Sequence, residues 1–185
     1  MKKIVLAALA ATSALIAVPA AAQNASGTVN VSGTVAPKCT AITPIAGNIV
    51  LNELALANGT VDTAFTANTN LSLSFTVRCT GANPELSADA NPLVNTAIVT
   101  PASGYTNTVH YNATLTALRA GGGSGSIVDS TTNAAATTGN VGDRLANLAN
   151  NVTIAVSSGS TSTATDLLEA GTYGGTIDII VGPPV

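Results

Sequence analysis

The sequence predicts an all-β fold, a sandwich of immunoglobulin-like size with about six to seven short strands and one disulfide. Apolar and polar residues alternate in several separate runs, which is the period of a half-buried strand. Stretches rich in Gly, Pro, Ser and Asn separate these runs, as turns do in sandwich domains. The chain has only two cysteines, Cys39 and Cys79.

Residues 1–22 are typical of a secretory signal peptide. Lys2 and Lys3 supply the positive charge, residues 4–18 are mostly apolar, and residues 19–22 form a small-residue cleavage site. The apolar run is shorter than the ~20 residues of a membrane span. We therefore expect an exported chain that begins near Gln23, with no direct membrane insertion of the mature protein.

The first predicted strand covers residues 27–36. Val29, Val31 and Val35 fall on one face with Gly33 in the same register, and polar residues fall on the other. No turn signal leads from this run into a following strand. It is therefore either part of the chain's own sheet or an arm offered to another molecule.

Cys39 and Cys79 are predicted to form a disulfide, because an even pair in an exported protein is usually oxidised. Closing a loop of ~40 residues would stabilise the fold by about 4 kcal/mol in the chain-entropy model. The chain has no CxxC motif, and its single histidine cannot complete a zinc site. Cys39 then divides the mature chain into an arm (residues 23–38) and a domain (residues 39–185).

The clearest strand of the domain is predicted at residues 71–79, where apolar side chains alternate without a fault up to Cys79. A disulfide requires Cα atoms about 5.5 Å apart, so it would place Cys39 beside the end of this strand. Further strands are expected at residues 48–56, 93–100, 108–118, 152–156 and 177–181. A hairpin loop is expected at residues 121–125, surface connections at 131–142 and 157–165, and one or two helical turns at 143–150.

Composition favours a structural role over an enzyme. Charged residues make up only 8% of the chain, and outside the signal peptide four scattered basic residues stand against nine acidic ones, so no nucleic acid is expected as a partner. The carboxylates are isolated along the chain, and His110 lies on the polar face of its strand, whereas acid–base catalysis requires converging groups. We expect no catalytic residue, no cofactor and no metal site.

Four features together resemble the archaic chaperone-usher pilus subunits and the spore coat protein U domain. These are the signal peptide, the alternating arm that runs into a cysteine (GTVNVSGTVAPKC), the strand that ends in the second cysteine (LSFTVRCTG), and the final AGTYGGTIDIIV strand. The resemblance implies an incomplete, pilin-type sandwich that lacks its last strand. It also implies that a periplasmic chaperone first fills the resulting groove, and that the arm of a neighbouring copy then replaces the chaperone strand at an outer-membrane usher.

The resemblance also assigns residues. It makes residues 27–36 the donated strand, with Val29, Val31, Gly33 and Val35 as the side chains that enter the groove. It lines the acceptor groove with Leu73, Phe75, Val77, Ile177, Ile179 and Val181. The expected product is a head-to-tail polymer at the cell surface, reached through the periplasm. The alternative is a self-contained secreted sandwich of a spore coat or surface layer, in which residues 27–36 pair within their own sheet.

Overall fold

The computed structural model describes residues 26–184, so the predicted signal peptide and residues 23–25 of the arm lie outside the described residues. The described residues form twelve strands and no helix, and hence no helix long and apolar enough to cross a membrane. The strands are β1 (Cys39–Ala41), β2 (Ser72–Phe75), β3 (Val77–Cys79), β4 (Glu85–Ala90), β5 (Leu93–Val94), β6 (Tyr105–Thr106), β7 (Thr108–Leu118), β8 (Ser124–Ser130), β9 (Thr137–Asn140), β10 (Val152–Ser160), β11 (Leu167–Leu168) and β12 (Ile177–Gly182).

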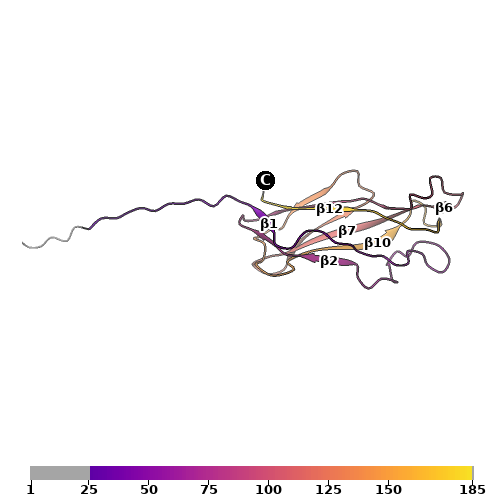
Figure 1. Ribbon diagram of the computed structural model, residues 1–185, viewed down its shortest axis with the longest axis horizontal. Helices are drawn as coiled ribbons and strands as arrows, with labels where there is room; N and C mark the ends of the chain where they lie inside the picture. Colours follow the sequence, from indigo (N-terminus) through magenta and orange to yellow (C-terminus); the bar gives the residue numbers. More distant parts are fainter. Residues whose placement is uncertain (1–25, 185) are drawn as a thin grey trace, which may run out of the picture. The chain divides into compact units, whose positions relative to one another are not determined.

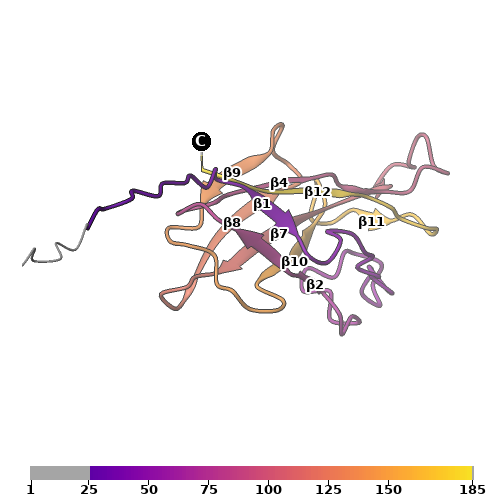
Figure 2. The same ribbon diagram turned by 60° about the vertical axis from the view of Figure 1, so that its left-hand side comes forward.

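Two larger sheets enclose the hydrophobic core of the domain (Figure 1). One runs in the order β2-β10-β7, with both β5 and β8 paired to the far edge of β7; the other has the order β12-β4-β9. Figure 2 shows β4, β9 and β12 together on one side and β2, β7, β8 and β10 on the other. All pairings in these two sheets are antiparallel. β1 pairs with β3, and β11 pairs in parallel with β6.

The strand β7 is the centre of the larger sheet and occupies the predicted residues 108–118. Its residues alternate between buried and half-buried over almost its full length, because one face packs on the core and the other faces outward. The inward side chains of β4 pack into the same core. The final strand, β12, agrees with the predicted residues 177–181 to within one residue.

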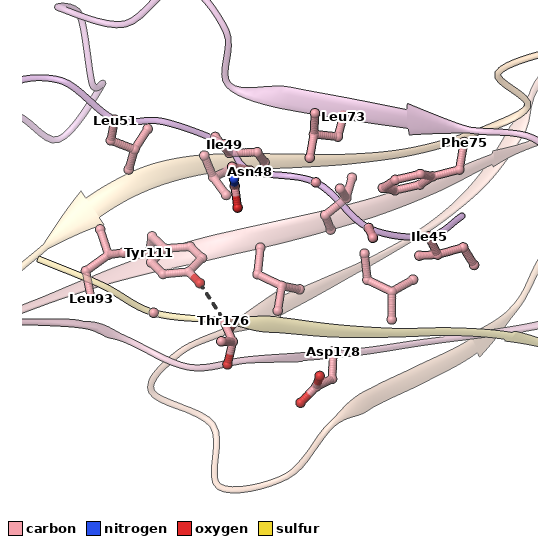
Figure 3. A pocket seen from close by; sticks show the side chains of 17 residues that line it. Ile45, Asn48, Ile49, Leu51, Leu73, Phe75, Leu93, Tyr111, Thr176 and Asp178 are labelled. Carbon is pink, nitrogen blue, oxygen red and sulfur yellow. Dashed lines mark hydrogen bonds between the residues drawn. The ribbon is translucent and has the colours of Figure 1, made fainter. Parts of the chain in front are cut away.

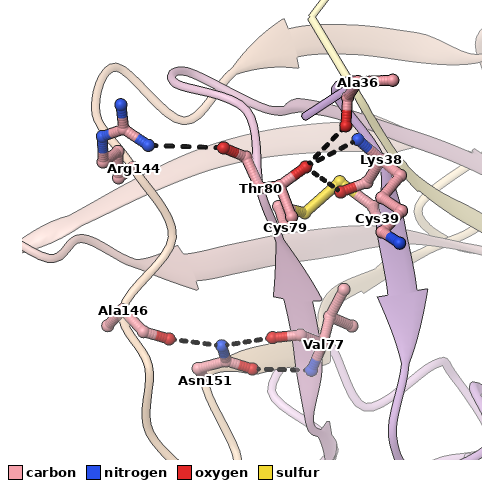
Figure 4. Close-up of a disulfide and its surroundings, with 9 residues drawn as sticks. All are labelled: Ala36, Lys38, Cys39, Val77, Cys79, Thr80, Arg144, Ala146 and Asn151. Atoms are coloured by element: carbon pink, nitrogen blue, oxygen red, sulfur yellow. Dashed lines mark hydrogen bonds between the residues drawn. A yellow bond between two sulfur atoms is a disulfide. The ribbon is translucent and has the colours of Figure 1, made fainter. Parts of the chain in front are cut away.

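The disulfide between Cys39 and Cys79 is confirmed, with an S–S distance of 2.06 Å, and it joins opposed residues of β1 and β3 (Figure 4). Beside it, Thr80 donates its backbone N–H to the Lys38 carbonyl (2.9 Å), and its hydroxyl accepts the Lys38 N–H (3.0 Å). The amide of Asn151 is buried and exchanges two hydrogen bonds with the backbone of Val77. A disulfide of this kind indicates an oxidising, extracytoplasmic location.

Several predicted elements are wrong because their backbone found other partners. The predicted strand at residues 71–79 breaks at Thr76, where three consecutive side chains are buried and the chain passes from β2 to β3. Residues 143–150 are not helical, because the Ala146 N–H bonds to the Leu118 carbonyl at the end of β7. Residues 27–36 carry no strand among the described residues, so their pairing within the chain's own sheet is not observed, and their role as an arm stays a prediction.

The lengths of other elements also differ from the prediction. The run at residues 48–56 contributes only an isolated bridge at Ala55, and only the first two residues of the 93–100 run form a strand. The expected connection at residues 131–142 contains β9, and β10 continues to Ser160. The strand count exceeds six to seven because several strands have only two or three residues.

A buried carboxylate joins the edges of the two larger sheets. Asp129, on β8, is fully buried and accepts hydrogen bonds from the backbone N–H of Ala90 (2.8 Å), from the Asn133 amide (3.1 Å) and from the Thr137 hydroxyl (2.6 Å). Burial alone would raise the pKa of Asp129, but these hydrogen bonds favour the charged form and hold its pKa below the ordinary 3.8.

We expect Asp129→Ala to lower the free energy of unfolding by about 3 kcal/mol at neutral pH, because it leaves the N–H of the buried Ala90 and the hydroxyl of the half-buried Thr137 without their acceptor. The depressed pKa adds stability above pH ~3.8, and this stability is lost as the pH falls through the lower pKa of the folded state. Urea unfolding at pH ~7 and pH ~3 should therefore show a smaller difference between variant and parent at the lower pH. The control is Asp89→Ala, which removes an exposed carboxylate on β4 and should change stability little.

Candidate binding groove beside the C-terminal strand

A cavity of about 450 Å³ lies between β12 and the edge of β2 (Figure 3). One wall is the start of β12, and the opposite wall is an extended stretch without strand pairing, residues 45–51, which we name the facing segment. The floor is apolar and comes from β2, β7 and β10. The lining side chains that carry the argument are Ile45, Ile49, Leu51, Leu73, Phe75, Tyr111, Ile154, Val156, Ile177 and Ile179.

The edge of β12 that faces this cavity carries unpaired backbone groups. The backbone N–H of Asn91 donates to the Thr176 carbonyl (2.8 Å), so Thr176 opens a ladder in which every second residue bonds to β4. Asp178 and Ile180 continue that set, and the backbone groups of Ile177, Ile179 and Val181 point away from β4. The backbone N–H of Ala90, the residue opposite Ile177, supports this assignment, because it donates to Asp129 and not to β12. Among the described residues, β12 pairs with β4 alone.

The facing segment also lacks backbone partners. The described residues make no backbone–backbone hydrogen bond to residues 45–51, although the segment is extended. Ile45, Ile49 and Leu51 are half-buried and pack on the core, while the residues between them are exposed. The cavity thus lies between two chain segments that both have backbone groups free for hydrogen bonding.

The floor of the groove is already well packed. Phe75, Tyr111, Ile154 and Val156 are 2–6% exposed, and the Tyr111 hydroxyl donates to the Thr176 carbonyl (3.5 Å). Burial, with a smaller contribution from the charge of Asp129, raises the pKa of Tyr111 to about 12, so this phenol stays neutral and acts as a donor. The described residues that line the cavity include one carboxylate, Asp178 on β12, and no basic side chain. The floor itself is apolar, so it suits apolar side chains.

A second cavity, of about 660 Å³, continues the groove beyond the start of β12. It shares Ile49, Leu51 and Leu93 with the first cavity, and residues 49–55 and 168–173 form its sides. The hydroxyl of Tyr173 donates to the Glu169 carbonyl (2.9 Å) and holds one of these sides in place. The shared lining joins the two cavities into one continuous groove.

The structure brings together four of the six side chains assigned to the acceptor groove. Leu73, Phe75, Ile177 and Ile179 line the first cavity. Val77 is 1% exposed within the core and does not line it, because the chain turns from β2 to β3 at Thr76. Val181 is half-buried near the end of β12 and also lies outside the lining.

The groove contains residues that the sequence did not assign to it. Tyr111, Ile154 and Val156 belong to predicted strands, and their inward register was the available signal. Ile49 and Leu51 belong to the predicted strand at residues 48–56, which pairs only through the bridge at Ala55. The sequence did not indicate that Ile45 lines the groove, since this residue follows a proline-containing turn and lies outside any predicted strand.

The residues assigned to the arm are exposed in the free chain. Val29 is 86% exposed, Val31 92% and Val35 78%, and no heavy atom lies within 4 Å of a Cβ built on Gly33. Residues 26–38 carry no strand. The three valine side chains are therefore largely exposed, and their role as donors stays a prediction.

Comparison of the chain with protein-family models, with characterised proteins and with solved structures found no match. Within residues 26–184 there is no group of three or more His, Cys, Asp or Glu side chains suited to holding a metal ion.

Proposed function

We propose that this protein is the structural subunit of an extracellular fibre, in which the N-terminal arm of one copy completes the incomplete immunoglobulin-like sandwich of the next. The observation that carries the proposal is the groove, where an apolar cavity lies between the unpaired edge of β12 and the unpaired facing segment. A strand laid there bonds to both edges and covers the floor, which is strand addition.

The arm has the alternating, exposed apolar side chains that an apolar groove can bury. Each of Val29, Val31 and Val35 is more than three-quarters exposed, and burying a valine side chain stabilises a complex by about 1.5–3 kcal/mol. Gly33 falls in the same register and presents no side chain. The polar residues between the valines face outward when the valines face inward. The arm therefore offers one apolar face to the floor of the groove and unpaired backbone groups along both of its edges.

The direction of the inserted strand decides what kind of assembly forms. Pro37, at the root of the arm, and Pro184, just after β12, both lie against Gly81. A strand inserted parallel to β12 would end beside Pro184, at the end of the domain from which the acceptor's own arm also leaves. Two copies could then exchange arms reciprocally and close as a dimer. A strand inserted antiparallel to β12 ends at the opposite end of the domain, and the contact repeats head to tail without closing. Antiparallel pairing is also slightly more stable per residue, which favours the fibre.

The resemblance to archaic chaperone-usher subunits supplies the proposed route. A periplasmic chaperone lends a strand to the groove after export, and an outer-membrane usher is the place where the arm of the next copy replaces it. The proposed partners are thus these two proteins and neighbouring copies of the chain, and the final location is the cell surface. In the self-contained alternative, residues 27–36 are a strand of the domain's own sheet, whereas residues 26–38 contain no strand.

The test of this proposal is the oligomeric state of the purified mature protein in SDS. Donated strands unfold slowly, so we expect a ladder of SDS-resistant multimers in unheated samples that collapses to one monomer band on boiling, with the disulfide kept oxidised. Reduction after boiling should leave the monomer band in place, which separates strand exchange from intermolecular disulfides. Monomers alone, under every concentration and incubation time, would contradict the proposal.

A further inference from the structure

The basic side chains of the domain are gathered at one end. Lys38 is next to the disulfide; its N–H donates to the Thr80 hydroxyl, and its carbonyl accepts from the Thr80 N–H. Arg78 lies between Val77 and Cys79 on β3. Arg144 donates from its guanidinium to the Thr80 carbonyl (3.3 Å) (Figure 4), and Arg119 donates to the Val141 carbonyl (2.7 Å) in the neighbouring loop. These four are all the basic residues outside the signal peptide. We call this region the disulfide end; its acidic residues are Glu85 and Asp143.

The carboxylates of four acidic residues lie at the opposite end, where the described residues include no Lys or Arg. Glu53 and Glu169 lie on the two sides of the second cavity, and their carboxylates accept the backbone N–H groups of Ala55 (2.9 Å) and Ala102 (3.2 Å) respectively. Asp62 and Asp166 belong to the adjoining loops, which the Thr60–Leu167 bridge joins. We call this region the loop end. Figure 1 shows β6, at the loop end, and β1, at the disulfide end, at opposite extremes of the domain.

Antiparallel donation brings these two ends into contact. The donated strand of residues 27–36 would run against β12, so its last residues would lie beside the start of β12, where the second cavity opens. Lys38 follows only two residues later and is exposed, so it arrives at the rim that carries Glu53 and Glu169. Arg78 and Arg144, around Thr80, follow on the same surface.

We propose that the joint between consecutive subunits is an electrostatic contact of the disulfide end of one copy with the loop end of the next, centred on Lys38 against Glu53 and Glu169. This inference rests on the proposed fibre and adds a second recognition element outside the groove. Opposite charges at the two ends accelerate encounter in the head-to-tail orientation and oppose the reciprocal dimer, in which like ends would meet.

The test is a charge exchange in the full mature chain, with the rate of SDS-resistant ladder formation as the readout. Lys38→Glu alone and Glu53→Lys alone should each slow assembly about tenfold at low salt, because each places like charges in the joint. The double variant should assemble faster than Lys38→Glu alone, because it restores one opposite pair, and more slowly than the parent, because Glu169 is unchanged. Raising the salt from about 0.01 M to about 1 M shortens the Debye length from about 30 Å to about 3 Å and should bring all rates together.

Matched controls separate the joint from net charge and from folding. Asp89→Lys changes the charge by the same amount as Glu53→Lys, at an exposed position on the outer face of β4, and should not slow assembly. The melting temperature of each variant reports folding, and Glu53→Gln gives a milder variant in which the Ala55 N–H still meets an oxygen. Single reversals that assemble at the parent rate, or a double variant no faster than Lys38→Glu alone, would overturn the joint while the ladder of the parent protein still supports the fibre. A parent protein without a ladder overturns both.

Discussion

A Val31→Asp chain is expected to stay monomeric while its domain folds as stably as that of the parent. Val31 is 92% exposed in the free chain, so the domain gains nothing from it. In a neighbour's groove the same side chain would lie against an apolar floor with no basic partner. Losing a buried valine costs about 1.5–3 kcal/mol, and burying an unpaired carboxylate costs several kcal/mol more. The expected result is loss of all bands above the monomer in unheated SDS samples.

The matched control for this variant is Asn30→Asp. It adds the same charge one residue away, on the face of the arm that points outward when the valines point inward. We expect its ladder to resemble that of the parent. If Val31→Asp and Asn30→Asp reduce the ladder equally, assembly does not depend on the apolar face of the arm.

An Ile179→Asp chain is expected to fail at the other half of the same contact. Ile179 lines the first cavity, and its backbone groups point toward the open edge of β12. A carboxylate there prevents an incoming apolar face from packing, so the chain cannot accept a strand although its own arm is intact. Because Ile179 also packs on the core, we expect a lower melting temperature, and circular dichroism must show the parent β content before the result is interpreted.

Ile180→Asp is the neighbouring control. Ile180 is 64% exposed and faces outward from β12, so the same substitution leaves the groove unchanged. This variant should form the full ladder. Loss of polymers in both variants would indicate damage to β12 as a whole and not to the groove.

The strands with an unbroken local pattern were predictable from the sequence. β7 and β12 were found almost to the residue, because each buries one face and polar residues occupy the other. The disulfide was predictable because an exported chain with two cysteines has only one pairing. The break at Thr76 was not, since the Thr76 N–H donates to the Thr43 hydroxyl and the Thr76 hydroxyl accepts from the Asn150 N–H, and both partners lie far away in the sequence.

The groove was predictable only in part, for the same physical reason. Ile177, Ile179, Leu73 and Phe75 belong to alternating runs, and the resemblance placed them together. The facing segment has the apolar spacing of a strand at Ile49 and Leu51, but the described residues give it no paired neighbour. Whether a run pairs depends on which edges the rest of the fold leaves free, and local periodicity does not contain that information. The charge separation between the two ends likewise emerges only when residues distant in sequence are placed on the fold.

Mixing the two defective chains tests the central claim most directly. The Val31→Asp chain keeps its groove and the Ile179→Asp chain keeps its arm, so only one kind of joint is possible between them. We predict that each chain alone gives monomers in unheated SDS samples, and that the mixture gives a heat-sensitive dimer containing one copy of each, with nothing larger. A mixture that stays monomeric, or either chain forming a ladder alone, would contradict the account of an arm donated into the groove beside β12.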